Sequence, residues 1–350
     1  MEKGLVSVIL PVYNAASTIK ESLVSVCNQT YTKLEIIVIN DGSTDNSLEV
    51  IKEIAKNDGR IKIINKNNEG LIKGLNQGLS LANGEYIARM DADDLCYADR
   101  IEKQVKYLNK HLDIGLLGTA VKTFQKTNHE VSFLSDSNQI RLKLFFQNEF
   151  AHPSVMIRHQ VLLDNELKYN DRYLHVEDYG LWSSISRISK VSNLKTPLLH
   201  YRVSDSSVSA LATKKILERN EMHFRIYRDN FDLINLNYTD EDLSFHRAIS
   251  GNSPYYFNRL EHFSVIESWF LTLEEEFKKL DGITDRDIQR VLSLQFYNAS
   301  NKFTSLGLLF FAKYMKTKWS KSVGFKNNLR LFLKSFMKYK AEKAIPFDLA

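Results

Sequence analysis

The residues best suited to chemistry in this chain are three carboxylates that follow an apolar stretch. Residues 85–90 read as a buried strand, and Asp91, Asp93 and Asp94 come directly after it. Carboxylates a few ångströms apart repel one another and raise one another's pKa unless a cation lies among them. Ligands that are all oxygen favour Mg²⁺ or Mn²⁺. The cluster therefore indicates a divalent metal that carries a nucleotide diphosphate, and the alternative is a solvated acidic turn.

Two further polar groups follow apolar stretches of the same kind. Pro11, Tyr13 and Asn14 come at the end of the first stretch, and Asp41 follows the second. A tyrosine at a strand end suits stacking on a nucleobase, and a carboxylate suits the imide N–H of uracil. The alternatives are a half-buried aromatic side chain at Tyr13 and a turn-forming residue at Asp41.

These groups need a scaffold that brings strand ends together, and the first hundred residues predict one. Apolar stretches alternate with helical patterns at the spacing of strand–helix–strand units. The stretches lack polar alternation, as expected for strands covered on both faces. We therefore expect an α/β fold with a mostly parallel open sheet flanked by helices, in which ligands bind at the carboxyl ends of the strands. The predicted strands are 5–10, 34–39, 61–64 and 86–90, and the predicted helices are 15–28, 44–56, 70–81 and 98–109.

The middle of the chain mixes strand and helix patterns, and only helical patterns remain near its end. We expect strands over 154–158 and 198–202 and a helix over 178–189. The sequence thus predicts one domain over 1–210 and a helical region over 211–350. Two cysteines cannot form a disulfide framework, and the N-terminus has no room for a signal peptide, so we expect a cytoplasmic protein.

Charge is unevenly distributed along the chain. The segment 302–343 contains eleven Lys and Arg and one Glu, so it carries +10 and the remainder −5. Within this segment, apolar residues recur at helical spacing with a basic stripe beside them. The composition suits a helix lying in the interface of an anionic membrane, and we expect no nucleic-acid partner. The alternative is a helix packed on the protein body or in a dimer. The apolar residues are Leu329, Phe332, Leu333, Phe336 and Met337, and the basic residues are Lys326, Arg330, Lys334 and Lys338.

Seven short motifs follow one another along the chain: Pro11-Val-Tyr-Asn14, Asp41-Gly-Ser-Thr-Asp45, Asn68-Glu-Gly70, Asn83-Gly-Glu-Tyr-Ile87, Asp91-Ala-Asp-Asp94, Glu177-Asp178 and Tyr201-Arg202. Together they resemble the ordered motifs of family 2 glycosyltransferases, which are inverting enzymes with the GT-A fold that use nucleotide sugars. The combination is specific, although each motif alone is not. The resemblance covers about residues 4–210, and nothing equivalent supports 211–350.

On the donor side, the resemblance implies a UDP-sugar and a Mn²⁺ or Mg²⁺ ion. Asp93 would bind the metal that bridges the diphosphate, and Asp91 would contact the ribose. Asp94 either supports the metal site or starts the next helix. A guanidinium suits phosphate oxygens, so Arg202 is expected to pair with the diphosphate, the alternative being a surface ion pair. The residues expected to hold the nucleotide are Pro11, Tyr13, Asn14 and Asp41.

On the acceptor side, the resemblance makes Asp178 the general base. It would take the proton of an acceptor hydroxyl in a single displacement that inverts the anomeric carbon. The alternative for Glu177 and Asp178 is an acid pair stabilised by the helix dipole. Glu177, His152 and Trp182 are the candidate acceptor-side residues, and the alternatives are a structural role for His152 and a core position for Trp182.

One position departs from the family pattern. Many relatives carry a His two residues after the Tyr-Arg pair, where this chain has Ser204, so the metal has fewer protein ligands or His200 serves instead. The resemblance implies a glycan acceptor, on a lipid carrier at the inner face of the membrane, in capsule, O-antigen or cell-wall synthesis. The alternatives are a nucleotidyltransferase, which would need a basic glycine-rich loop at 13–17, and a membrane-associated non-catalytic scaffold, against which the intact acids argue.

Overall fold

A computed structural model describes residues 1–203, 216–251, 253–340 and 345–347. The chain divides into two compact units, each described by itself below. The first comprises Met1–Ile140 and Glu149–Met222, and the second comprises Arg141–Asn148 and His223–Ala350. The boundary predicted near 210 falls within 204–215, which lie outside the described residues.

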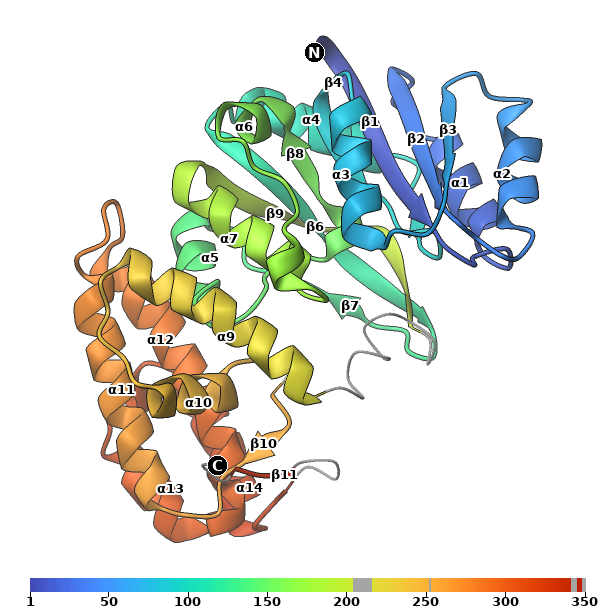
Figure 1. The fold of residues 1–350 in the computed structure, drawn as a ribbon. Helices are drawn as coiled ribbons and strands as arrows, with labels where there is room; N and C mark the ends of the chain where they lie inside the picture. The colour runs from blue at the N-terminus through green and yellow to red at the C-terminus, as the bar shows by residue number, and fades with distance from the viewer. Residues whose placement is uncertain (204–215, 252, 341–344, 348–350) are drawn as a thin grey trace. The chain divides into compact units, whose positions relative to one another are not determined.

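The first unit is built on one open sheet (Figure 1). The four strands at one edge are parallel, as predicted, and Val8 of the central strand pairs with both Ile36 and Ala88. Beyond them the sheet is mixed, because β8 runs antiparallel to both of its neighbours. A short strand, β7 (Glu130–Val131), pairs with β6 off the main path. The strand order is β3 (Ile61–Lys66), β2 (Leu34–Asp41), β1 (Glu2–Val12), β4 (Gly84–Arg89), β8 (Met156–Arg158), β6 (Ile114–Gln125), β9 (Lys190–Val203) and β5 (Leu95–Cys96).

Helices cover both faces of the parallel strands, which explains why these strands lack polar alternation. Val8 and Leu10 share an aliphatic core with Leu23 of α1. On the opposite face, a Cβ at Gly78 of α3 would lie 2.6 Å from the side chain of Ile9, so glycine permits close packing there. The helical elements of this unit are α1 (Ile19–Cys27), α2 (Ser47–Ala55), α3 (Leu71–Leu81), α4 (Arg100–Lys110), α5 (Ser137–Lys143), which continues into the second unit, η1 (His152–Ser154), α6 (His159–Asp164), η2 (Asp171–Tyr173) and α7 (Glu177–Ile188).

The sequence prediction missed β6, although it is twelve residues long. Gly115 and Gly118 interrupt its apolar pattern, and glycine weakens the signal of a strand. At Gly118 a Cβ would lie 2.8 Å from the ring of Phe150, so the sheet and its covering segment approach closely there. The long parallel pairing with β9 stabilises β6 although its local sequence pattern is weak.

The second unit is almost entirely helical, as predicted. Thr239 and Thr284 begin α10 and α12 with capping boxes that use Asp242 and Asp287. None of the helices in the described part of the chain is both long enough and apolar enough to cross a membrane. The elements are α9 (Ile216–Leu233), whose first residues belong to the first unit, α10 (Asp240–Ile249), β10 (Tyr255–Tyr256), α11 (Glu261–Phe277), α12 (Asp285–Ser300), η3 (Asn301–Leu306), α13 (Leu308–Met315), η4 (Trp319–Lys321), α14 (Phe325–Phe336) and β11 (Ile345–Pro346).

Candidate functional site

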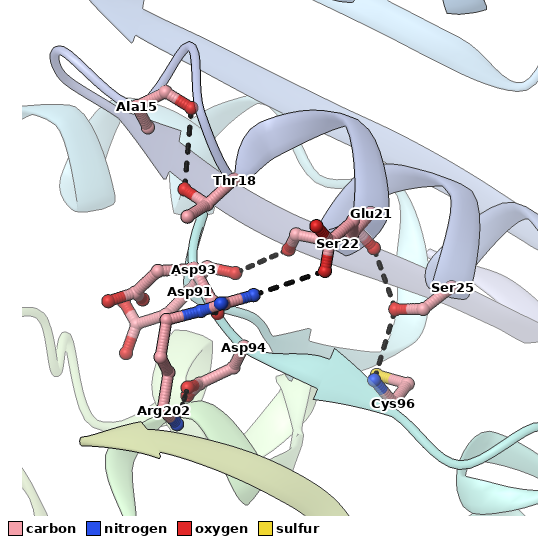
Figure 2. Close-up of polar contacts among 10 residues, drawn as sticks. All are labelled: Ala15, Thr18, Glu21, Ser22, Ser25, Asp91, Asp93, Asp94, Cys96 and Arg202. Atoms are coloured by element: carbon pink, nitrogen blue, oxygen red, sulfur yellow. Dashed lines mark hydrogen bonds and ion pairs between the residues drawn. The ribbon is translucent and has the colours of Figure 1, made fainter. Parts of the chain in front are cut away.

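The three predicted carboxylates form one cluster at the carboxyl end of β4. One oxygen atom each of Asp91, Asp93 and Asp94 can be chosen so that all lie within 4.8 Å of one another. Figure 2 shows the three side chains between α1 and the strand that carries Arg202. The parallel strands β1 and β4 end on the same side of the sheet, which brings this cluster to the edge where ligands of α/β sheets bind.

The electrostatics of this cluster favour a bound cation. Burial, together with the neighbouring charge of Asp91, raises the pKa of Asp93 to about 6. The same two effects raise the pKa of Asp94 well above its ordinary value. Asp94 is 1% exposed, and its Oδ2 atom has no hydrogen-bond partner among the described residues. A divalent cation with oxygen ligands would relieve the repulsion and use the unpaired oxygen, so the donor set fits Mg²⁺ or Mn²⁺.

Helix α1 holds the backbone of the acidic segment in place (Figure 2). The Ser22 hydroxyl donates to the carbonyl oxygen of Asp91 over 2.6 Å. The Ser25 hydroxyl donates to the Ser22 carbonyl over 2.7 Å and accepts from the backbone N–H of Cys96 over 3.0 Å. The hydroxyls of one helix face therefore fix both ends of the turn between β4 and β5.

Arg202, at the end of β9, is bound to the same segment. Its backbone N–H donates to Oδ1 of Asp94 over 2.7 Å, and its Nε donates to the carbonyl oxygen of Asp93 over 2.5 Å. Its Nη2 lies 3.3 Å from Glu21, and the guanidinium stacks 4.5 Å from the ring centre of Phe124. Asp94 thus joins the acidic turn to β9 and does not start α4, which begins at Arg100. Contact of Arg202 with a diphosphate stays a prediction.

The alternative metal ligands are not part of this cluster. The ring of His200 stacks on Tyr97 with 4.3 Å between ring centres, and His200 is absent from the acidic group found among the described residues. Ser204 lies outside the described residues. The metal-binding prediction therefore rests on the carboxylates alone.

The loops after β1 and β2 are tied together beside the acidic cluster. Asn14 adopts a left-handed backbone conformation with φ 49°, which asparagine tolerates better than most residues. Its N–H donates to Ser43 over 3.0 Å, and its side-chain oxygen accepts from the N–H of Thr44 over 2.8 Å. Pro11 pairs with Ile39 in the sheet, and Tyr13 is 54% exposed. Asn14 has a structural role here, and the exposed ring of Tyr13 is accessible for stacking.

Asp41 is buried and organises the segment that precedes α3. Its two oxygens accept from the backbone N–H groups of Glu69 over 3.0 Å and Gly70 over 2.8 Å. Lys66 also lies 3.9 Å from its Oδ1. Recognition of uracil by Asp41 stays a prediction. The structure also gives this carboxylate a structural role, because it holds the backbone of Glu69 and Gly70.

The second acid pair begins α7. Burial and the charge of Asp178 raise the pKa of Glu177 to about 7. Glu177 is 7% exposed, whereas Asp178 is only partly buried. The Oδ1 atom of Asp178 accepts from the N–H of Tyr179 over 2.7 Å. The two acids therefore occupy different environments, as adjacent positions on a helix should.

Aromatic side chains surround this helix and include two of the candidate acceptor-side residues, Trp182 and His152. Trp182 has no exposed surface, and its ring packs against Phe150, His152 and Tyr169. It therefore occupies the core position given as the alternative and offers no surface for direct contact with an acceptor. Nε2 of His152 lies 3.0 Å from the hydroxyl of Tyr169. Burial and the charge of Arg89 hold the pKa of His152 well below its ordinary value, so its ring is neutral. A direct acceptor contact of His152 stays a prediction.

Arg89 is the residue of this site to which the sequence prediction assigned no role. It is 3% exposed, forms an ion pair with Asp91, and has a buried Nε without a hydrogen-bond partner among the described residues. Its charge opposes the rise in the pKa of both Asp93 and Glu177. One buried guanidinium therefore acts on both acid groups. A basic residue inside an apolar strand, two positions before an acid, was the available signal.

Several known proteins are similar to this chain in sequence. The family described as glycosyl transferase family 2 matches residues 7–164. An uncharacterized glycosyltransferase of Haemophilus influenzae is 35% identical over 327 residues, which cover 89% of this chain and 91% of the relative. The uncharacterized glycosyltransferase MJ1057 of Methanocaldococcus jannaschii is 31% identical over 64% of this chain and 83% of the relative.

A solved structure shares the fold at low sequence identity. S. aureus TarS 1–349 in complex with UDP superposes with a TM-score of 0.54 at 18% identity, over 96% of this chain and 91% of TarS 1–349. The sheet flanked by helices and followed by a helical region is thus a GT-A-like glycosyltransferase fold. With the sequence relatives, this identifies the chain as a member of glycosyltransferase family 2.

Proposed function

We propose that this glycosyltransferase is a metal-dependent, inverting enzyme that transfers a sugar from a UDP-sugar to a hydroxyl group of a glycan. The observation that carries the proposal is the buried Arg89, which forms an ion pair with Asp91 and whose charge also lowers the pKa of Asp93, after β4, and of Glu177, at the start of α7. The first group suits the donor diphosphate, and the second suits the acceptor. A single displacement needs both on one site.

At the donor end, Asp93 would hold Mn²⁺ or Mg²⁺ with help from its acidic neighbours. When bound, the ion supplies Lewis-acid stabilisation of the diphosphate leaving group. Asp91 would contact the ribose, and Tyr13 and Asp41 the uracil. A UDP-sugar is the proposed donor because TarS, which shares the fold, has been solved with UDP and with UDP-GlcNAc.

At the acceptor end, Asp178 would act as the general base. Its carboxylate takes the proton as the acceptor oxygen forms a bond to the anomeric carbon, and the bond from that carbon to the UDP oxygen breaks. The attack comes from the face opposite UDP, so the configuration inverts. Burial and the charge of Asp178 raise the pKa of Glu177 to about 7, so in its protonated form it could donate a hydrogen bond to the acceptor. A pKa near neutral also suits a general base, which makes Glu177 the second candidate for that role.

The proposed acceptor is a surface glycan, carried on a lipid at the inner face of the membrane, in capsule, O-antigen or cell-wall synthesis. This part of the proposal rests on the motif resemblance and places the enzyme in the cytoplasm at the membrane periphery. The relatives are named as glycosyltransferases, which supports a glycosyltransferase over the nucleotidyltransferase alternative.

Calorimetry of UDP binding tests the metal site. We expect Mn²⁺ to strengthen binding of UDP to the wild-type protein and to have no such effect on Asp93→Asn, because the variant loses the charge that attracts the ion. Asp113→Asn is the matched control, since Asp113 is an exposed acid of the same unit that pairs with Lys190. A Mn²⁺ effect of normal size in Asp93→Asn would refute the assignment.

A further inference from the structure

Helix α14, which Figure 1 labels in the second unit, carries a set of exposed apolar side chains. Phe325 is 81% exposed, and Phe336 and Met337 are each 66% exposed. Leu329, Phe332 and Leu333 complete the surface and are between 36% and 47% exposed. We call this set of six residues the α14 face. Large apolar side chains gathered on one exposed helix face mark an interaction surface.

The opposite side of α14 attaches the helix to its unit, largely through polar groups. Leu331 and Ser335 are fully buried. Asn328 accepts from the hydroxyl of Tyr314 over 2.9 Å and donates to the carbonyl oxygen of Ser320 over 2.8 Å. The usual arrangement of an amphipathic helix is thus reversed, because most of its apolar residues point away from the unit. Within the second unit, this face is therefore exposed and is not packed in the core.

Neighbouring rings support the α14 face. Phe332 lies 5.3 Å from Phe311 of α13 and 6.3 Å from Phe336, measured between ring centres. Leu309 of α13 is itself 71% exposed. Phe311, Phe332 and Phe336 therefore form a row of neighbouring rings across α13 and α14.

Basic residues border the α14 face. Residues 321–340 contain six Lys and Arg and no Asp or Glu. Lys326, Arg330 and Lys338 are exposed, and none forms a salt bridge among the described residues. Lys334 departs from the predicted stripe, because its Nζ donates to Asn301 over 2.8 Å and so points towards the unit. An exposed apolar face with an uncompensated positive border matches the chemistry of an anionic lipid surface.

We propose that the α14 face inserts into the interface of an anionic membrane, with the helix lying along the surface. The apolar rings enter the region between headgroups and acyl chains, and the basic residues bind headgroup phosphates. A second copy of the chain is a poorer occupant, because a two-fold contact through this face would bring the basic borders of both copies together. The proposal concerns where the enzyme acts and does not depend on its donor or mechanism.

Co-sedimentation of the full chain with vesicles tests the proposal. We expect binding to vesicles of phosphatidylcholine with phosphatidylglycerol, weaker binding at high salt, and at least tenfold weaker binding to phosphatidylcholine alone. The triple variant Phe332→Ser, Leu333→Ser, Phe336→Ser should lose binding. The matched control is Leu271→Ser, Leu294→Ser, which removes leucines of similar exposure, 43% and 45%, from other helices of the unit.

A charge variant separates the electrostatic part of the interaction from the apolar part. Lys326→Gln with Arg330→Gln should weaken binding to the anionic vesicles by roughly 30-fold, about fivefold for each basic residue. Far-UV circular dichroism and thermal unfolding check that each variant is folded. Hydrolysis of a UDP-sugar in solution should be unchanged in all of them, which distinguishes failure of this proposal from failure of the proposed function.

Three results would overturn the membrane proposal. The first is absence of vesicle binding by the full chain, and the second is equal binding to neutral and anionic vesicles. The third is a dimer in solution that the triple variant dissociates, because the occupant of the α14 face would then be a second copy.

Discussion

The two units depart from ordinary packing in opposite ways. The first unit buries charge, since Arg89, Asp94 and Glu177 are each less than a tenth exposed. The second unit exposes apolar surface, since Phe325 and Phe336 are each about two-thirds exposed or more. Either arrangement costs free energy in an isolated chain.

Buried charge and exposed apolar surface are each relieved by a different kind of partner. Crowded carboxylates are relieved by a cation and by the phosphates that it carries. Exposed rings are relieved by an apolar medium, and a basic border selects one with negative headgroups. In both units, the candidate functional surface lies where buried charge or exposed apolar rings carry a cost in free energy that a partner can relieve.

The cores of the two units also differ in the side chains that fill them. Around the parallel strands, the core is mostly Val, Ile and Leu. In the helical unit, aromatic rings fill the centre, and they include Phe263, Phe270, Phe296, Phe310, Tyr314 and Trp319. β-Branched residues suit strands, and each aromatic side chain buries a large apolar area, which suits the core of a helical unit.

The largest effect should come from the acid pair of the first unit. In Asp178→Asn, we expect sugar transfer to fall by about 10² to 10⁴, because an amide cannot accept the acceptor proton. Donor affinity measured by calorimetry should be unchanged. Asp171→Asn, at an exposed acid of the neighbouring η2 helix, is the control and should transfer normally. Near-normal transfer by Asp178→Asn would move the base to Glu177 or another group.

The aromatic core of the second unit gives the next largest effect. Phe296 is fully buried against Phe263, Phe270 and Trp319, so Phe296→Ala should lower the free energy of unfolding by about 3–5 kcal/mol. Phe325→Ala, which removes a highly exposed ring of the same unit, should change it by less than about 0.5 kcal/mol. Denaturant unfolding measures both.

UDP binding by Phe296→Ala tests whether the two units have separate roles. It should persist in Phe296→Ala, because the proposed nucleotide residues belong to the first unit. If UDP binding disappeared while the first unit stayed folded, the separation of roles between the units would fail.

Substitution of Glu177 should change the free energy of unfolding by an intermediate amount that depends on pH. Its pKa is raised from 4.5 to about 7 in the folded protein, so the folded state binds more protons than the unfolded state between these values. Its contribution to stability therefore falls as the pH rises through this window. Glu177→Gln should raise the free energy of unfolding by roughly 2–3 kcal/mol at pH 8 and leave it unchanged below pH 4.5. Thermal unfolding across this pH range measures the difference, and a gain independent of pH would contradict the buried charge.

The smallest effect belongs to the α14 face. Leu333→Ser should lower the free energy of unfolding by about 1 kcal/mol or less, because nearly half of the Leu333 surface is already exposed. Leu331→Ala, two residues earlier on the buried side, should cost about 2 kcal/mol or more. Denaturant titrations compare the two variants directly. A large loss in Leu333→Ser would mean that this face is covered within the protein.

Local patterns determined much of the first unit. The first four strands and their helices follow from alternating apolar and helical stretches, which act over a few residues. The same patterns placed Asp41, Asp91 and Asp93 at strand ends, and parallel pairing brings strand ends to one edge. The amphipathic pattern also predicted which side chains of α14 share a face.

Contacts between distant residues decided the rest, because no local pattern encodes them. The sequence did not reveal that Arg89 pairs with Asp91 and that its charge also acts on Glu177, or that Arg202 holds the acidic turn from β9. Periodicity predicts that Leu329, Phe332 and Leu333 lie together, but the same period results whether a face points into a core or into solvent. Only the packing of Leu331, Ser335 and Asn328 against the unit decided which side of α14 points outward.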